Sequence, residues 1–213
     1  MPKVTKERSN ARRDEIINAC AELYETTCFK DLTLKDIGKA TSFTRTSIYN
    51  YFQTKEEIFL ALLEREYDLW NADLTDILEK NESLSADEFA DKLARSLEKR
   101  ERLLKLMSMN HYDMESSSRI ENLTEFKRSY GRSLQLVTRC AEKFFPAMSA
   151  GEVRNFVYIF FPFMFGIYPY TYVTDKQRKA MKNAEADYVF MSVYEITFSC
   201  VKNLLSPAES RKA

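Results

Sequence analysis

Residues 34–59 read LKDIGKATSFTRTSIYNYFQTKEEIF, and this stretch decides the fold. Its apolar residues recur at helical spacing in two short segments, 34–41 and 45–51, which are joined by a tight connection. Thr33 with Asp36 resembles a capping box that starts the first segment, with aspartate in the place of the usual glutamate. The stretch therefore predicts two short helices in immediate succession.

Helical periodicity continues on both sides of this stretch. Apolar residues at helical spacing over 11–27 predict a helix before the two short ones. A full capping box at Thr54 and Glu57 starts a helix that is expected over 54–79. Further helices are expected over residues 86–98, 100–112, 119–145, 150–172 and 184–205. The sequence shows no sustained alternation of the kind that strands require, so we predict an all-α fold.

Charge is balanced overall but uneven along the chain. Lys plus Arg and Asp plus Glu both number 32, so no global field attracts nucleic acid. Residues 1–55 nevertheless hold ten basic and seven acidic side chains, which leaves 22 and 25 for the remainder. We expect a basic amino-terminal arm that is able to meet phosphate, and a merely solvated terminus is the alternative. The basic residues of this arm are Lys3, Lys6, Arg8, Arg12 and Arg13.

Composition argues against several other classes of protein. The chain has 213 residues, of which 45% are hydrophobic and 30% charged, so it is expected to fold rather than remain disordered. Its four cysteines are scattered and its single histidine is His111, so we predict no metal site and no cofactor. The sequence also lacks a G-x-S-x-G motif and a glycine-rich phosphate loop, which argues against an enzyme.

One uncharged run raises the question of a membrane. Residues 156–173 reach the length of a transmembrane helix, but Pro162, Gly166 and Pro169 interrupt the run and four tyrosines carry hydroxyls through it. We therefore expect a deeply buried helix that the two prolines kink or end, and no membrane partner. The polar amino terminus does not resemble a signal peptide, so the expected compartment is the cytoplasm, with reduced thiols.

The three helices expected within the first 52 residues fit a helix-turn-helix. In that unit one short helix crosses the DNA backbone while the next presents its exposed face to a major groove. On the third helix, Ile48 and Phe52 are spaced to pack inward. The residues left outward or flanking are Arg45, Thr46, Tyr49 and Asn50. An arginine fork suits guanine and an asparagine amide suits adenine. Phosphate oxygens suit the polar groups of Thr44, Ser47, Tyr49, Tyr51 and Lys55.

The core Ile48-Tyr-Asn-Tyr-Phe52, followed by Lys55 and Glu56, resembles the TetR family of one-component transcriptional regulators, over about residues 10–65. The resemblance implies a helix-turn-helix DNA-binding domain at residues 1–53 and a C-terminal helical bundle for ligand binding and dimerisation at 54–213. The implied function is a repressor that binds a double-stranded DNA operator. The implied DNA contacts are Thr33, Lys35, Thr44, Arg45, Thr46, Ser47, Tyr49, Asn50, Tyr51 and Lys55.

Three positions depart from the family pattern, since Cys28, Ser42 and Thr46 stand where members often carry glycine. If Cys28 or Ser42 took a left-handed conformation, each would cost on the order of 1 kcal/mol relative to glycine. The alternative is a turn of slightly different geometry. Thr46 adds a methyl and a hydroxyl to the face nearest DNA, so the base preference of glycine-bearing relatives does not carry over.

Aromatic residues gather near the end of the chain, where nine of the 28 lie within residues 156–173. A helix that is apolar all round must be covered on every side. The resemblance implies that the last two long helices pair with their copies in a second subunit, so that a homodimer reads a near-palindromic operator. The matching stripe of the final helix is expected from Val189, Phe190, Val193, Ile196, Thr197, Val201 and Leu204.

The remaining aromatic surface is expected to line a cavity for a small hydrophobic or aromatic effector, and ordinary core is the open alternative. The expected lining is Met107, His111, Phe126, Tyr130, Tyr158, Phe161, Phe165 and Tyr168. A ligand that prefers a conformation in which the two recognition helices no longer match successive major grooves would release the repressor from DNA. The alternative function is a helical protein–protein interaction module, or a regulator that a protein partner controls instead of a small ligand.

Overall fold

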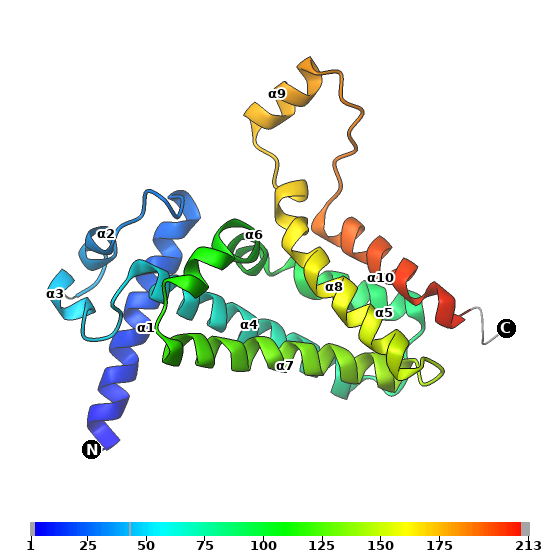
Figure 1. Ribbon diagram of the computed structural model, residues 1–213, viewed down its shortest axis with the longest axis horizontal. Coiled ribbons are helices and arrows are strands. Elements are labelled where there is room, and N and C mark those ends of the chain that lie inside the picture. The colour runs from blue at the N-terminus through cyan, green and yellow to red at the C-terminus, as the bar shows by residue number, and fades with distance from the viewer. Residues whose placement is uncertain (1–2, 43, 210–213) are drawn as a thin grey trace. The chain divides into compact units, whose positions relative to one another are not determined.

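The structure is a computed structural model that describes the backbone of residues 3–42 and 44–209, and the side chains of these residues except 3–6, 45, 109–111 and 206–209. All regular structure in this part of the chain is α-helical (Figure 1), so the all-α prediction is confirmed. The helices are α1 (Lys3–Thr26), α2 (Leu34–Lys39), α3 (Arg45–Ile48), α4 (Lys55–Lys80), α5 (Ala86–Glu98), α6 (Glu101–Ser116), α7 (Ile120–Phe144), α8 (Ala150–Thr171), α9 (Asp175–Asn183) and α10 (Val193–Glu209).

The chain forms two compact units. The first comprises Met1–Arg65 and Asn110–Arg128, and the second comprises Glu66–Met109 and Ser129–Ala213. Because α4, α6 and α7 each contribute residues to both units, the packing does not change at residue 53, where we expect the DNA-binding function to end. The functional division at 53 and 54 stays a prediction.

The core of the first unit joins α1, α2 and α3 to the start of α4. Tyr24 of α1 packs edge-to-face on Phe59 of α4 with ring centroids 5.0 Å apart, and Phe29 packs on the same ring at 4.7 Å. α2 contacts both α1 and α3, and Ile37 of α2 and Ile48 of α3 are fully buried. These contacts hold the two short helices in place, since neither is long enough to be stable alone.

The core of the second unit is aromatic and contains a satisfied polar network. The indole Nε1 of Trp70 donates to Oγ of Ser96 at 3.0 Å. The amide of Asn71 donates to the carbonyl of Ser129 at 3.0 Å and accepts from the hydroxyl of Ser133 at 2.8 Å. Because these polar groups are buried, their hydrogen bonds tie α4 to α5 and α7 in one register.

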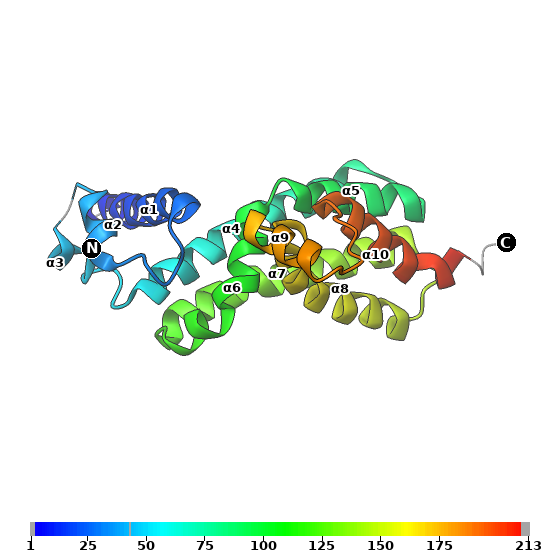
Figure 2. The same ribbon diagram turned by 90° about the horizontal axis from the view of Figure 1, so that it is seen from above.

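α10 packs against α5 and α8 and lies between them (Figure 2). Val193, Thr197 and Val201 of the predicted stripe are buried within the chain itself. The predicted use of these three residues as a partner-facing stripe is therefore wrong, because the chain itself already covers them. Ile196 and Leu204 stay partly exposed.

α8 is continuous from Ala150 to Thr171, with Pro162 and Pro169 inside it, so of the two expected outcomes, a kink or an end, the prolines do not end the helix. Both prolines lie on the exposed face, where water can solvate the carbonyls that lose their amide partners. The opposite face is buried, whereas Tyr158 and Ile159 are 69% and 51% exposed. Within one chain the helix is thus covered on one side only, and the expectation that a second copy covers the other side stays a prediction.

Among the described residues, no single helix is long and apolar enough to cross a membrane. α8 and α9 pass that test only when they are taken together, as a pair bent by 84°.

The sequence misses α9 and misplaces two helix starts. α1 begins at Lys3 instead of residue 11, so the expected basic arm is part of a helix. α9 lies between the helices expected over 150–172 and 184–205, and Thr174 and Gln177 form a capping box at its start. α10 begins at Val193, because residues 184–192 form the irregular return from α9 instead of a helix.

Candidate DNA-binding and effector sites

Thr33 and Asp36 position α2. The Thr33 hydroxyl accepts from the Asp36 amide at 3.3 Å and donates to the Asp36 carboxylate at 2.5 Å, which completes the predicted capping box. This hydrogen bond to Thr33 is the main reason that the pKa of Asp36 is lowered. The Thr33 hydroxyl is therefore already engaged in capping, whereas Lys35 is exposed on the first turn of α2.

The turn between α2 and α3 is held from α1. The Ser42 amide donates to the carboxylate of Glu15 at 2.6 Å, and this bond lowers the pKa of Glu15. Within residues 3–42 and 44–209, only Glu185 among non-glycine residues has a positive φ. Cys28 and Ser42 are thus accommodated by a turn of different geometry, and the left-handed strain considered for them is not present.

Recognition helix α3 is anchored by two buried side chains. Ile48 and Phe52 are 0% and 1% exposed, in agreement with their predicted inward packing. The amides of residues 51 and 52 both donate to the Ile48 carbonyl, so a helical turn continues past α3. The exposed predicted contacts are Thr44, Thr46, Tyr49 and Asn50, and the half-buried ones are Ser47 and Tyr51. The side chain of Arg45 lies outside the described residues.

Lys55 is engaged with the chain itself. Its ammonium donates to the carbonyls of Phe29 and Leu32 at 2.7 and 3.3 Å, and it lies 4.4 Å from the centroid of the Phe29 ring. These bonds secure the segment between α1 and α2. A phosphate contact, as the sequence suggests for Lys55, would compete with them.

The basic residues of α1 differ in their surroundings. Arg8 and Arg12 are exposed, whereas Arg13 lies 5.4 Å from the Phe52 ring centroid and 3.8 Å from the carboxylate of Glu64. Arg13 therefore covers the anchor of α3. The side chains of Lys3 and Lys6 lie outside the described residues.

Sequence reasoning missed one link to the recognition segment. Arg119, just before α7, donates through Nη2 to the carbonyl of Tyr51 at 3.2 Å and pairs with Glu57. Glu57 also accepts from the Gln53 amide at 2.7 Å. A capping glutamate next to a distant arginine gives no signal in the sequence, because the two positions are separated by 62 residues.

The predicted effector residues in the second unit are only partly brought together. Tyr130 packs edge-to-face on Phe161 at 5.7 Å and on Tyr67 at 5.6 Å, while Trp70 lies 5.9 Å from Phe161. These four rings are the packed core of the unit. Met107 is also buried, and Phe165 is half-buried. Phe126 and His111 belong to the first unit, where Phe126 is buried and the side chain of His111 lies outside the described residues.

Tyr158 does not belong to this group, which corrects the prediction. Its ring is 69% exposed although Phe161, three residues later, is buried. Three residues correspond to a 60° rotation on an α-helix, and the boundary of the buried sector falls between the two positions. Residues spaced like a stripe in the sequence are therefore split between core and surface.

The carboxyl end of α8 carries a second aromatic pair. Tyr168 and Tyr172 stack with ring centroids 4.6 Å apart. Burial, followed by the negative charge of Glu101, raises the pKa of Tyr172 to about 12 and also raises the pKa of Tyr168.

A buried anchor under a short exposed helix, braced by α1 and α2, defines a helix-turn-helix transcriptional regulator. The comparison with protein families specifies the class. The profile described as bacterial regulatory proteins, tetR family, matches residues 16–62. The profile described as tetracyclin repressor-like, C-terminal domain, matches residues 64–195. The chain belongs to the TetR family of transcriptional regulators, whose members are generally DNA-binding proteins without enzymatic activity.

One curated relative is the uncharacterized HTH-type transcriptional regulator YfiR of Bacillus subtilis (strain 168). It is 36% identical over 67 residues, which are 32% of this chain and 33% of the relative, so the match spans about a third of that protein.

Solved structures share the fold at low sequence identity. A TetR-family regulator from Mesorhizobium loti has a TM-score of 0.61 and 17% identity, covering 94% of this chain and 98% of that one. The regulator FadR from Bacillus subtilis, in complex with stearoyl-CoA, has a TM-score of 0.56 and 16% identity, covering 90% and 97%. The similarity extends over nearly the whole length of both chains.

Proposed function

We propose that the protein is a homodimeric repressor that binds a near-palindromic operator and is released from it by a small apolar or aromatic effector. The observation that carries the proposal is the recognition helix. Ile48 and Phe52 are buried under it, while Thr46, Tyr49 and Asn50 are exposed where a major groove would meet them.

We assign direct base readout to Asn50 and Arg45. An asparagine amide matches adenine and an arginine fork matches guanine, and each bidentate pair discriminates by about 1 to 3 kcal/mol. Lys35 is exposed and suits phosphate. The hydroxyls of Thr44, Thr46, Ser47, Tyr49 and Tyr51 complete the proposed contacts.

The proposed dimer forms through the open faces of α8 and α10. On α8 an exposed or half-exposed stripe runs through Asn155, Ile159, Pro162 and Gly166. A groove of about 280 Å³ lies between the two helices, lined in part by Ile159 and Leu204, and can receive a side chain from the second copy. Two recognition helices related by a twofold axis then read two half-sites about 34 to 36 Å apart.

The proposed effector site would form where the aromatic core of the second unit opens. Tyr130 and Phe161, which pack on each other in the single chain, would then supply apolar walls. FadR from Bacillus subtilis, which shares the fold, holds a molecule with a long apolar chain, stearoyl-CoA. An apolar effector is thus compatible with this architecture.

Coupling between effector and operator would run through continuous helices. α4, α6 and α7 each pass from one unit into the other, so a shift of these helices in the second unit reaches the first. Typical coupling energies of about 1 to 3 kcal/mol correspond to roughly 5-fold to 150-fold changes in affinity.

Selection of bound duplexes from a random DNA pool by the full chain tests the proposal. We expect a near-palindromic sequence to be enriched, and Asn50→Ala to lose preference at one position of each half-site. Gln135→Ala, an exposed amide in the second unit, is the matched control. Failure to enrich any duplex at low ionic strength would overturn the proposal. Effectors are then screened through the fluorescence of Trp70, the single tryptophan, which lies against Phe161.

A further inference from the structure

Residues 172–192, here called the arm, project from the second unit between the end of α8 and the start of α10 (Figure 1). All nine residues of α9, each of them described, are at least partly exposed. A helix of this length is not stable alone in water. The arm is therefore an element that other contacts must hold.

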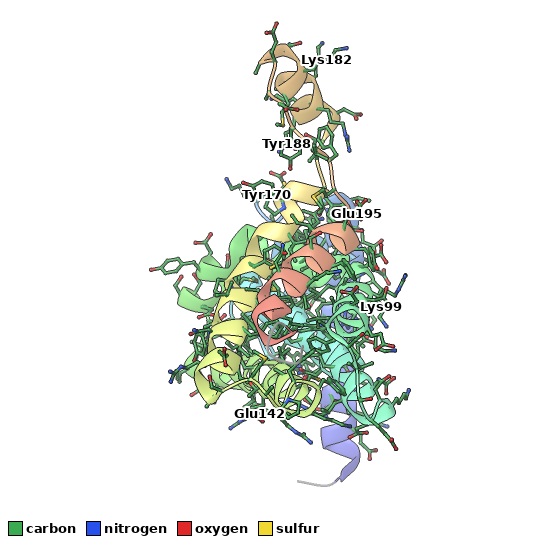
Figure 3. All side chains as sticks on the ribbon, turned by 90° about the vertical axis from the view of Figure 1, so that its right-hand side faces the viewer. Lys99, Glu142, Tyr170, Lys182, Tyr188 and Glu195 are labelled. Atoms are coloured by element: carbon green, nitrogen blue, oxygen red, sulfur yellow. The ribbon has the colours of Figure 1, made fainter. Side chains whose placement is uncertain are left out.

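Part of that support lies at the base of the arm (Figure 3). The hydroxyl of Tyr188 donates to the carbonyl of Tyr170 at 3.0 Å, and the two rings stack at 6.4 Å. Phe190 packs on Tyr188 at 4.9 Å, and the guanidinium of Arg178 lies 4.2 Å from the centroid of the Phe190 ring. These contacts give the arm a defined shape in the single chain.

The arm nevertheless leaves apolar surface open. Val189 is 76% exposed, Tyr170 57% and Phe190 42%. Beside them is a hollow of about 250 Å³, lined mainly by apolar groups of Pro169, Tyr170, Val173, Gln177, Ala180, Met181 and Tyr188. Exposed apolar residues grouped around a hollow mark a surface that another molecule covers.

The position of the hollow indicates which molecule covers it. Pro169 and Tyr170 belong to the open face of α8 and also line the hollow, so the arm surface is continuous with the proposed dimer face. A second copy docked on α8 and α10 therefore lies beside the arm. The arm carries four basic and three acidic residues, a balance too even to attract DNA or an anionic membrane.

We propose that the arm clasps a second copy of the chain, with Val189 and the hollow covered by the partner subunit in the dimer. The inference rests on the proposed dimer and adds a second, separable part to its interface. Each subunit supplies one arm, as an isologous twofold contact requires.

The test is the dimer dissociation constant of the full chain, measured by sedimentation. Val189→Glu places a charge on a side chain that is already exposed in the single chain, so the fold should not change. We expect it to raise the dissociation constant at least tenfold. Leu69→Glu, at an α4 side chain that is 43% exposed and outside both surfaces, is the matched control and should leave the constant unchanged.

Ile159→Glu tests the α8–α10 face separately from the arm, because the new charge should disrupt that face. If Ile159→Glu gives monomers while Val189→Glu dimerises like the wild type, the arm proposal is overturned and the proposed dimer stands. If Val189→Glu dissociates the dimer and Ile159→Glu does not, the arm is supported and the α8–α10 face is wrong. A wild type that is monomeric at all concentrations overturns both. Hydrogen exchange of residues 186–190 should also slow as concentration rises through the dissociation constant.

Discussion

The carboxylate of Glu57, 1% exposed at the start of α4, accepts hydrogen bonds from Nε and Nη2 of Arg119 at 2.6 and 2.9 Å. It also accepts from the Arg119 amide at 3.1 Å. The same guanidinium donates to the carbonyl of Tyr51, at the end of the recognition segment. One ion pair thus connects the segment between α6 and α7 to the region that precedes α4.

Arg119→Ala removes every side-chain bond of this pair and leaves a buried carboxylate without its cation. We expect the free energy of unfolding to fall by on the order of 2 to 4 kcal/mol, because an unpaired buried charge keeps its desolvation cost. Arg128→Ala is the control, since its pair with Glu125 on α7 is exposed and should contribute less than about 1 kcal/mol. Urea unfolding of both variants gives the comparison. Equal losses would show that the Glu57 pair is no more than a surface contact.

Glu57 should also affect how steeply the stability of the protein falls at acid pH. Burial acts to raise the pKa of Glu57, but the hydrogen bonds from Arg119 and from the Gln53 amide outweigh it, so the pKa is lowered from 4.5. A lowered pKa in the folded state stabilises the protein above the unfolded-state value, and this contribution is lost as the pH falls through the folded-state pKa. Glu57→Gln should therefore be less stable at pH 7 but lose stability less steeply below pH about 4.5. Parallel unfolding curves for wild type and variant down to pH about 3 would contradict this assignment.

Lys35 and Lys55 should behave differently in operator titrations. Lys35→Ala removes an exposed charge. We expect the slope of log binding constant against log salt concentration, here called the salt slope, to become shallower by about one for each phosphate that the variant no longer neutralises. Lys55→Ala removes bonds to the carbonyls of Phe29 and Leu32, so it should lower stability by on the order of 1 to 2 kcal/mol. Its salt slope should stay near the wild-type value. Lys80→Ala, exposed in the second unit, is the control. A shallower salt slope in Lys55→Ala without loss of stability would show that Lys55 contacts phosphate, as the sequence predicts.

The recognition helix was predictable because its information is local. Ile48 and Phe52 are four residues apart, and two caps mark the neighbouring helix starts: the capping box at Thr33, and the Thr54 hydroxyl, which accepts from the Glu57 amide. The predicted full box at Thr54 is only half formed, because the Glu57 carboxylate accepts from the Gln53 amide instead. The hydrogen bonds of Lys55 and the ion pair of Glu57 with Arg119 were not predictable, because their partners are distant in sequence. The exposure of Tyr158 was not predictable because it depends on a rotation of 60° around a helix. The arm of residues 172–192 was not predicted, because α9 is short and polar and its N-cap residues resemble a loop.

The cysteines should differ in reactivity towards an alkylating reagent at pH 8. Burial raises the pKa of Cys140 to about 12, so almost no thiolate forms in the native state, whereas Cys28 is exposed. Mass spectrometry should find Cys28 modified first and Cys140 modified only on unfolding. Comparable native rates for the two thiols would indicate that the second unit opens around Cys140.

Glu185 is the site where a substitution should stabilise the arm. Its φ is 51°, and it occupies the left-handed position of a helix end in which the Ala186 amide donates to the Met181 carbonyl at 3.1 Å and the Glu185 amide to that of Lys182 at 3.2 Å. Glycine adopts this conformation without the clash of a Cβ atom, so Glu185→Gly should stabilise α9 by on the order of 1 kcal/mol. Amide hydrogen exchange within α9 is the measurement, and this gain corresponds to about fivefold slower exchange. Glu185→Ala removes the same charge but keeps the Cβ atom, so it should show little of the effect. Slower exchange in both variants would trace the gain to the lost carboxylate instead of to the backbone.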